Sequence, residues 1–104
     1  MKKNLKTENF VEELYFRIAQ SAKKKKVNSY TKKLLKAGPK KIANKIGEES
    51  SELIIDYLKG SKKRIIEETA DLFYHVLLLL YSKKIDIKSL EKELKKRRKN
   101  DWIR

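Results

Sequence analysis

The chain has 104 residues, with 28 Lys or Arg against 14 Asp or Glu, so its formal net charge is +14. Its length suits one domain with one hydrophobic core. Only 3 Gly, 1 Pro and no Cys are present, which disfavours a fold of many short strands and excludes disulfides and thiolate metal sites. The longest apolar run, 76–81, is far shorter than the roughly 20 residues that span a bilayer. We therefore expect one cytoplasmic domain over residues 1–104, with no secretory signal and no membrane segment.

The hydrophobic pattern predicts an all-α fold of four to five helices, without strand-like alternation or internal repeats. Residues that favour helix ends lie at the limits of the apolar stretches. The expected boundary residues are Thr7 for the first helix, Ser29 and Gly38 for the second, Pro39 and Gly60 for the third, Ser61 and Ser82 for the fourth, and Asp86 for the fifth. A lysine run at 23–26 is expected to be an exposed linker, and residues 95–104 a basic C-terminal tail.

Apolar residues at helical spacing indicate which face of each helix enters the core. The expected core positions are Phe10, Leu14 and Ile18; Leu34 and Leu35; Ile42, Ile46, Leu53 and Tyr57; Ile65, Thr69, Leu72, Val76 and Leu80; and Ile87, Leu90 and Leu94. A polar stripe of Arg64, Glu68, Asp71 and His75 borders the core face of the fourth helix. We expect His75, the only histidine, to be a satisfied core residue rather than a partner of the Asp71 carboxylate.

Half of the acidic residues lie within 48–71, where seven acids face four bases. Two pairs stand three residues apart, Glu49 with Glu52 and Glu68 with Asp71, so each pair projects from one helix face. A turn at Gly60 should pack the two helices antiparallel and bring these pairs together. Carboxylates at the edge of a core must be protonated, paired or bound to metal, and oxygen ligands suit Mg²⁺. The alternative is a solvated acidic face that pairs with the many lysines.

Two acidic motifs carry a resemblance to a known superfamily. Gly47-Glu48-Glu49-Ser50-Ser51-Glu52, followed by Glu67-Glu68-Thr69-Ala70-Asp71, resembles the EExxE…EExxD signature of the MazG-type all-α nucleoside-triphosphate pyrophosphohydrolases. Further segments resemble the phosphoribosyl-ATP pyrophosphatase family of histidine biosynthesis: 29–35, Gly38, 45–49 and 70–75. This resemblance extends from about Phe10 to Arg98.

The resemblance implies Mg²⁺-dependent hydrolysis of 1-(5-phosphoribosyl)-ATP to phosphoribosyl-AMP and pyrophosphate. It implies that the metal is held by Glu49, Glu52, Glu68 and Asp71, with Glu48 as a further ligand or as the base that orients the attacking water. It also implies a four- to five-helix MazG-like bundle that is completed by a homodimer. Many relatives are fused to the phosphoribosyl-AMP cyclohydrolase, whose zinc site uses cysteines. This chain has no cysteine and only 104 residues, so we expect the cyclohydrolase to be a separate protein.

Four residues within the matching segments are candidates for substrate binding. Lys33 and Lys45 are candidates for contacts with the phosphates. Ser29 and Tyr30 are candidates for contacts with the sugar or the base. The alternative for the lysines is an ordinary surface role in a very basic chain. For Tyr30 it is packing against the bundle.

Two other functions compete with this interpretation. A house-cleaning pyrophosphohydrolase of noncanonical or deoxynucleoside triphosphates shares the acidic signature, and only the segments at 29–35 and 74–75 argue against it. A basic helical nucleic-acid-binding protein would explain the charge and the cluster at 95–99, with Trp102 beyond it. That second alternative leaves the clustered acids unexplained, so we expect no nucleic-acid partner. The placement of the acids also disfavours a purely structural helical dimerisation module.

Overall fold

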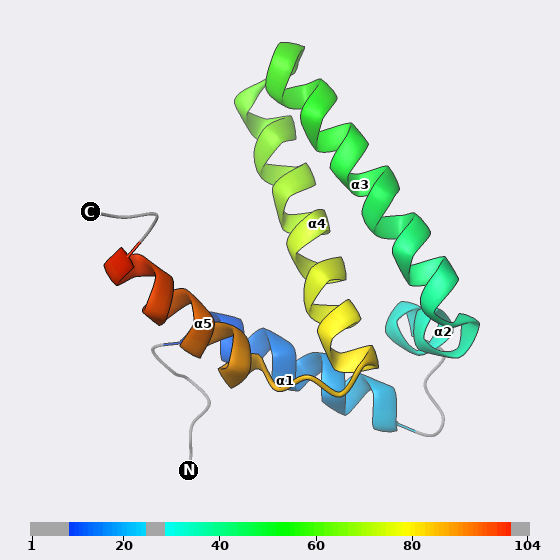
Figure 1. Cartoon of the computed structure of the whole chain (residues 1–104). Helices are drawn as coiled ribbons and strands as arrows, with labels where there is room; N and C mark the ends of the chain where they lie inside the picture. Colours follow the sequence, from blue (N-terminus) through cyan, green and yellow to red (C-terminus); the bar gives the residue numbers. More distant parts are fainter. Residues whose placement is uncertain (1–8, 25–28, 101–104) are drawn as a thin grey trace.

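The computed structural model describes residues 9–24 and 29–100, Lys99 and Asn100 by their backbone only. Within these residues the fold consists of five α-helices without strands (Figure 1), which confirms the predicted all-α class. The helices are α1 (Phe10–Lys23), α2 (Tyr30–Ala37), α3 (Pro39–Lys59), α4 (Lys62–Ser82) and α5 (Ile87–Asn100).

Helix boundaries follow the capping residues of the sequence. The side-chain oxygen of each cap accepts a hydrogen bond from a backbone N–H of the first turn, and the caps are Asn9, Ser29, Ser61 and Asp86. Three of these were predicted, whereas Thr7 lies outside the described residues and Asn9 caps α1. Gly38 ends α2 with a φ of 101°, a conformation that glycine adopts without strain, and Pro39 opens α3.

One apolar core lies where α1, α2 and α5 surround the C-terminal half of α4 and the start of α3. Its buried members are Tyr15, Ile18, Leu34, Ile42, Leu77, Leu78 and Ile87. The rest of α3 and α4 forms an antiparallel hairpin, and Figure 1 shows its Gly60 end projecting beyond the other helices. The hairpin interior, not the apolar core, brings the two acidic segments together.

The buried face of α4 differs from the prediction. The buried residues are Glu68, His75, Leu77 and Leu78, whereas Thr69 is exposed and donates its hydroxyl to a backbone carbonyl of its own helix. Because α3 alone covers the first half of α4, only the side that faces α3 is shielded there. Of the predicted polar stripe, Glu68 and His75 therefore lie on the inner face of α4, while Arg64 and Asp71 are exposed.

Besides Thr69, three other predicted core residues are exposed: Phe10, Tyr57 and Leu94. Each lies toward an outer part of its helix, beyond the core at the junction of the five helices. The predicted lysine linker at 23–26 begins one residue late, because Lys23 is the last residue of α1 and Lys24 is its C-cap; 25–28 lie outside the described residues. In the predicted basic tail, residues 95–100 continue α5, and 101–104 are likewise outside.

None of the described helices combines the length and the apolar character that crossing a membrane requires.

Candidate functional site

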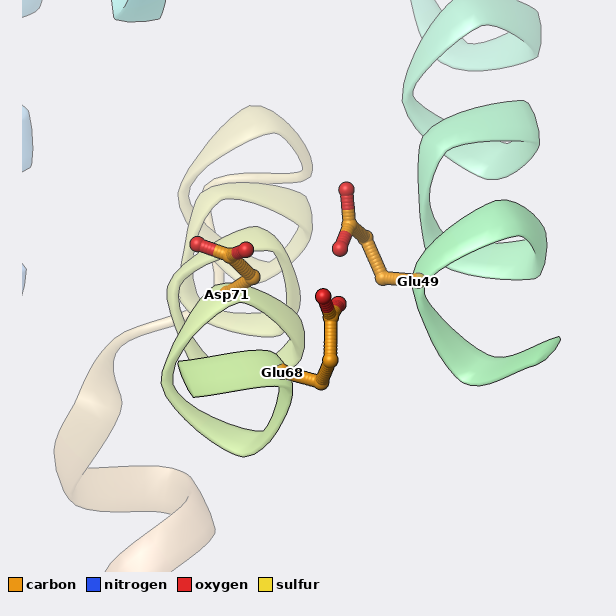
Figure 2. A group of neighbouring side chains, drawn as sticks. All are labelled: Glu49, Glu68 and Asp71. Atoms are coloured by element: carbon orange, nitrogen blue, oxygen red, sulfur yellow. The ribbon is translucent and has the colours of Figure 1, made fainter. Parts of the chain in front are cut away.

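Three of the four carboxylates predicted to bind metal converge inside the hairpin. Glu49 projects from α3 toward Glu68 and Asp71 on α4 (Figure 2). One carboxylate oxygen from each residue lies within 4.8 Å of the others. Glu49 and Glu68 are only 8% and 3% exposed, while Asp71 is open to solvent. The cluster therefore has a buried floor and one open side.

Two oxygens of this cluster are buried without a hydrogen-bond partner: Glu49 Oε1 and Glu68 Oε1. The second oxygen of each residue is near a cation, since Glu49 Oε2 lies 3.9 Å from Lys45 Nζ and Glu68 Oε2 accepts from Arg64. Burial raises the pKa of Glu49, and the negative charge of Asp71 raises it further. A buried oxygen without a partner is costly, so this arrangement calls for a bound cation or a proton.

Glu52, the fourth predicted ligand, is exposed and lies outside the group of three. It follows Glu49 by one turn of α3. A hydrogen bond and the charge of neighbouring Glu68 raise the pKa of Glu52. Glu52 therefore borders the cluster on the side of Glu68.

Arg64 is a site residue that the sequence analysis placed in the polar stripe without assigning it a role. Its Nη1 lies 2.9 Å from Glu67 Oε1, and its Nη2 contacts Glu68 and lies 3.7 Å from Asp56 Oδ2 on α3. The spacing of three and four residues to the two glutamates was a readable signal, whereas the contact with Asp56 depends on the hairpin. Arg64 thus offsets part of the negative charge at the Gly60 side of the cluster.

Lys45 and Glu48 lie together at the other side of the cluster. The Lys45 ammonium is 3.3 Å from Glu48 Oε1, and the Glu48 side chain remains 62% exposed. The hydrogen bond to Glu48 and the charge of nearby Tyr30 raise the pKa of Lys45. Lys45 is therefore a stable cation between an exposed and a buried carboxylate.

Tyr30 and His75 form a hydrogen-bonded pair beside Lys45. The Tyr30 hydroxyl is 2.7 Å from His75 Nε2, and His75 Nδ1 is 2.7 Å from the backbone oxygen of Asp71. His75 is buried and satisfied, as predicted, and it contacts the main chain of Asp71 rather than the carboxylate. Tyr30 is 48% exposed, so it is not an ordinary core residue.

The other two substrate candidates lie on α2. The Ser29 hydroxyl caps the helix by accepting from the Lys32 N–H, and it is also 2.9 Å from Ser21 Oγ. Lys33 is exposed one turn after Tyr30. Of the four substrate candidates, Lys45 contacts a residue of the cluster, and Tyr30 lies next to Lys45.

The segments of known proteins that are similar to this chain span the helices of the candidate site. The profile of the phosphoribosyl-ATP pyrophosphohydrolase family matches residues 11–98. The chain is 40% identical over 93 residues to the phosphoribosyl-ATP pyrophosphatase of Sulfolobus acidocaldarius, covering 89% of this chain and 98% of that protein.

Fused relatives are also similar. The chain is 46% identical over 77 residues to the histidine biosynthesis bifunctional protein HisIE of Staphylococcus epidermidis, covering 74% of this chain but 36% of that protein. For the HisIE protein of Bacteroides thetaiotaomicron the identity is 45% over 74 residues, covering 71% of this chain and 36% of the relative. The chain thus spans about a third of these bifunctional proteins. The resemblance inferred from the sequence is confirmed, and the chain belongs to the phosphoribosyl-ATP pyrophosphohydrolase family.

Proposed function

We propose that this protein hydrolyses 1-(5-phosphoribosyl)-ATP to phosphoribosyl-AMP and pyrophosphate, the second step of histidine biosynthesis, with Mg²⁺ as cofactor. Family membership supports the reaction. The observation that supports the metal is the pair of buried oxygens, Glu49 Oε1 and Glu68 Oε1, that have no partner. Oxygens of this kind are the ligands that a hard cation prefers.

Glu49, Glu68 and Asp71 would hold the metal, with Glu52 as the fourth ligand from the edge of the cluster. Bound there, Mg²⁺ supplies charge neutralisation for the polyphosphate and makes a coordinated water more acidic. The open side at Asp71 leaves room for substrate and water.

The remaining roles are proposed for side chains of α3 and α2. Glu48 is exposed and contacts Lys45, which also lies against Glu49, so Glu48 is our candidate for the base that orients the attacking water. Lys45 and Lys33 would neutralise phosphate charge, and Tyr30 and Ser29 would contact the base or the sugar. Lys45 is the best placed of these, because it already lies against Glu49.

We also propose that two copies of the chain pair through the α3–α4 hairpin. Large apolar side chains are exposed along it: Ile54, Ile55, Tyr57, Leu58, Ile66 and Phe73. Ile54 and Leu58 are four residues apart on α3, and Ile66 and Phe73 are seven apart on α4, so each pair shares a helix face. Apolar surfaces of this extent on a small protein usually mark an interface.

A phosphoribosyl-AMP cyclohydrolase is the proposed functional partner, because the product of this reaction is its substrate. The similarity to the bifunctional histidine biosynthesis proteins supports this link. Because the substrate is built from ATP, we place the reaction in the cytoplasm.

The test is release of pyrophosphate by the purified protein. Phosphoribosyl-ATP is compared with ATP, dUTP and dCTP, each in Mg²⁺ and in EDTA. We expect Mg²⁺-dependent turnover of phosphoribosyl-ATP alone. Turnover of only the simple triphosphates would assign the protein to house-cleaning, and inactivity on all four would contradict the proposal.

Variants connect that activity to the cluster. Glu49→Gln and Asp71→Asn should each lower turnover by roughly 100-fold or more while the helical circular dichroism is kept. The matched control is Glu93→Gln, which makes the same change in an exposed glutamate of α5 that pairs with Arg97. Full activity in either cluster variant would contradict the metal assignment.

A further inference from the structure

His75 connects α4 to α2 directly beside the carboxylate cluster. It lies one turn after Asp71 on α4, and its partner Tyr30 opens α2, 45 residues away in the sequence. The two rings meet edge to face, with centroids 5.6 Å apart and an interplanar angle of 86°. The pair therefore fixes both the position and the orientation of the Tyr30 ring.

The hydrogen-bond partners define the direction of each bond. A backbone carbonyl only accepts, so His75 Nδ1 carries the proton that is donated to the Asp71 oxygen. Nε2 of the neutral ring is then an acceptor, and the Tyr30 hydroxyl donates to it. The phenol oxygen keeps its lone pairs for other donors, and Lys45 is the nearby one.

A second hydrogen bond also attaches α2 to α4. Thr31, the next residue on α2, hydrogen-bonds to the hydroxyl of Tyr74, the residue before His75. Thr31 is buried and Tyr74 packs against the core, whereas Tyr30 is half exposed at the rim of the cluster. Two parallel bonds thus join the same helices, one beside the core and one at the site.

We propose that His75 is a positioning residue. It holds Tyr30, which contacts the substrate, at the rim of the carboxylate cluster. The exposed face of the Tyr30 ring then meets the nucleoside part of phosphoribosyl-ATP, while neighbouring Lys45 meets the phosphates. This inference rests on the proposed function. Because the contact lies away from the bond that is hydrolysed, it stabilises bound substrate and transition state alike, and its loss raises KM rather than lowering kcat.

The test compares steady-state kinetics for phosphoribosyl-ATP at saturating Mg²⁺. Tyr30→Phe removes the donor, and His75→Asn keeps a donor for the Asp71 carbonyl but lacks the acceptor for Tyr30. Each should raise KM roughly three- to tenfold with kcat within about twofold of wild type. The double variant should be no worse than either single variant, because both remove the same interaction.

Two further variants serve as controls. His75→Gln places an amide oxygen near the position of Nε2 and should restore part of the affinity. Tyr74→Phe removes the parallel hydroxyl between the same helices and should leave KM unchanged. A KM increase for Tyr74→Phe equal to that for Tyr30→Phe would show that the pair only holds α2 in place.

A spectroscopic readout reports the pair without substrate. Since the chain has a single histidine, its imidazole ¹⁵N signals report His75 alone. We expect the Nδ1–H tautomer in wild type and a shift confined to Nε2 in Tyr30→Phe. An unchanged KM in Tyr30→Phe, or a kcat that falls as much as KM rises, would overturn the proposed role of His75. Neither result would contradict the proposed function. Wild-type protein without turnover would instead contradict the function and with it the substrate role of Tyr30.

Discussion

The two ends of the molecule bury different kinds of side chain. At the junction of the five helices the buried residues are apolar apart from Thr31, and Leu77, Leu78 and Ile87 are completely inaccessible to solvent. Along the projecting part of the α3–α4 hairpin the buried residues are Glu49 and Glu68, while large apolar side chains face outward. The hairpin thus buries two carboxylates and exposes several large apolar side chains.

This difference indicates how each end is stabilised. Burial of apolar surface stabilises the helix junction within one chain. The hairpin contains two unpaired buried oxygens and an uncovered apolar surface, both of which are costly in an isolated chain. A cation inside and a second copy outside would remove these two costs.

The largest expected effect is on assembly. Leu58→Glu combined with Ile66→Glu places charges on the exposed apolar surface of both hairpin helices. Because burying an unpaired charge is very unfavourable, we expect a monomer at concentrations where wild type is a dimer. Size-exclusion chromatography with light scattering measures this directly.

The control for assembly is Phe16→Glu, which alters an exposed aromatic residue of α1 outside the hairpin. It should leave the dimer intact. A wild-type monomer, or a dimer that survives both hairpin charges, would contradict pairing through this surface.

The second-largest expected effect is the loss of stability when a core side chain is truncated. Leu78→Ala removes a completely buried side chain and should cost about 2–5 kcal/mol of the free energy of unfolding. Ile54→Ala, made in the monomeric double variant, should cost less than about 0.5 kcal/mol because that side chain is exposed. Urea denaturation of both in the same background gives the comparison, and equal costs would show that the hairpin surface is covered within one chain.

Much of the fold was readable because helix ends are local. The caps Ser29, Ser61 and Asp86 and the glycine at 38 were predicted from residue type and position, and the structure confirms them. The burial pattern was harder. Helical periodicity shows that Tyr57 lies on an apolar face but not what covers that face, and in this chain nothing described does.

In the candidate site, too, some features follow from local spacing and others depend on how the helices pack. Spacing along each helix predicted Glu49, Glu68 and Asp71 as neighbours, and one turn at Gly60 was enough to bring them together. The link between Tyr30 and His75 depends instead on how α2 packs against α4, across 45 residues. No local pattern carries that information, so only the folded chain reveals it.

Metal binding should stabilise the hairpin end specifically. Mg²⁺ at about 100 times its dissociation constant should raise the free energy of unfolding by about 2.7 kcal/mol. The increase should disappear in Glu49→Gln and persist in Leu78→Ala, which weakens only the other end. Urea denaturation with MgCl₂ replacing NaCl at constant ionic strength measures both, and an equal increase in Glu49→Gln would place the ion elsewhere.

The smallest effect is the pH dependence of the metal-free protein. Burial, together with Asp71, raises the pKa of Glu49 above its ordinary value of 4.5. Glu49 therefore holds its proton more tightly in the folded state, and this contribution to stability, complete below about pH 4.5, is lost as pH rises through the folded pKa. Gln at this position does not titrate, so in EDTA Glu49→Gln should gain stability relative to wild type between pH 5 and pH 7.

Glu93 provides a control of opposite sign. Its hydrogen bond with Arg97 lowers its pKa, so its contribution to stability is present above about pH 4.5 and is lost as pH falls through the folded pKa. Glu93→Gln should therefore become less stable relative to wild type as pH rises through the pKa of Glu93 in the folded state. If the stability of both variants relative to wild type changed in the same direction with pH, the buried carboxylate of Glu49 would already be paired without metal. The electrostatic difference between the two ends of the molecule would then be contradicted.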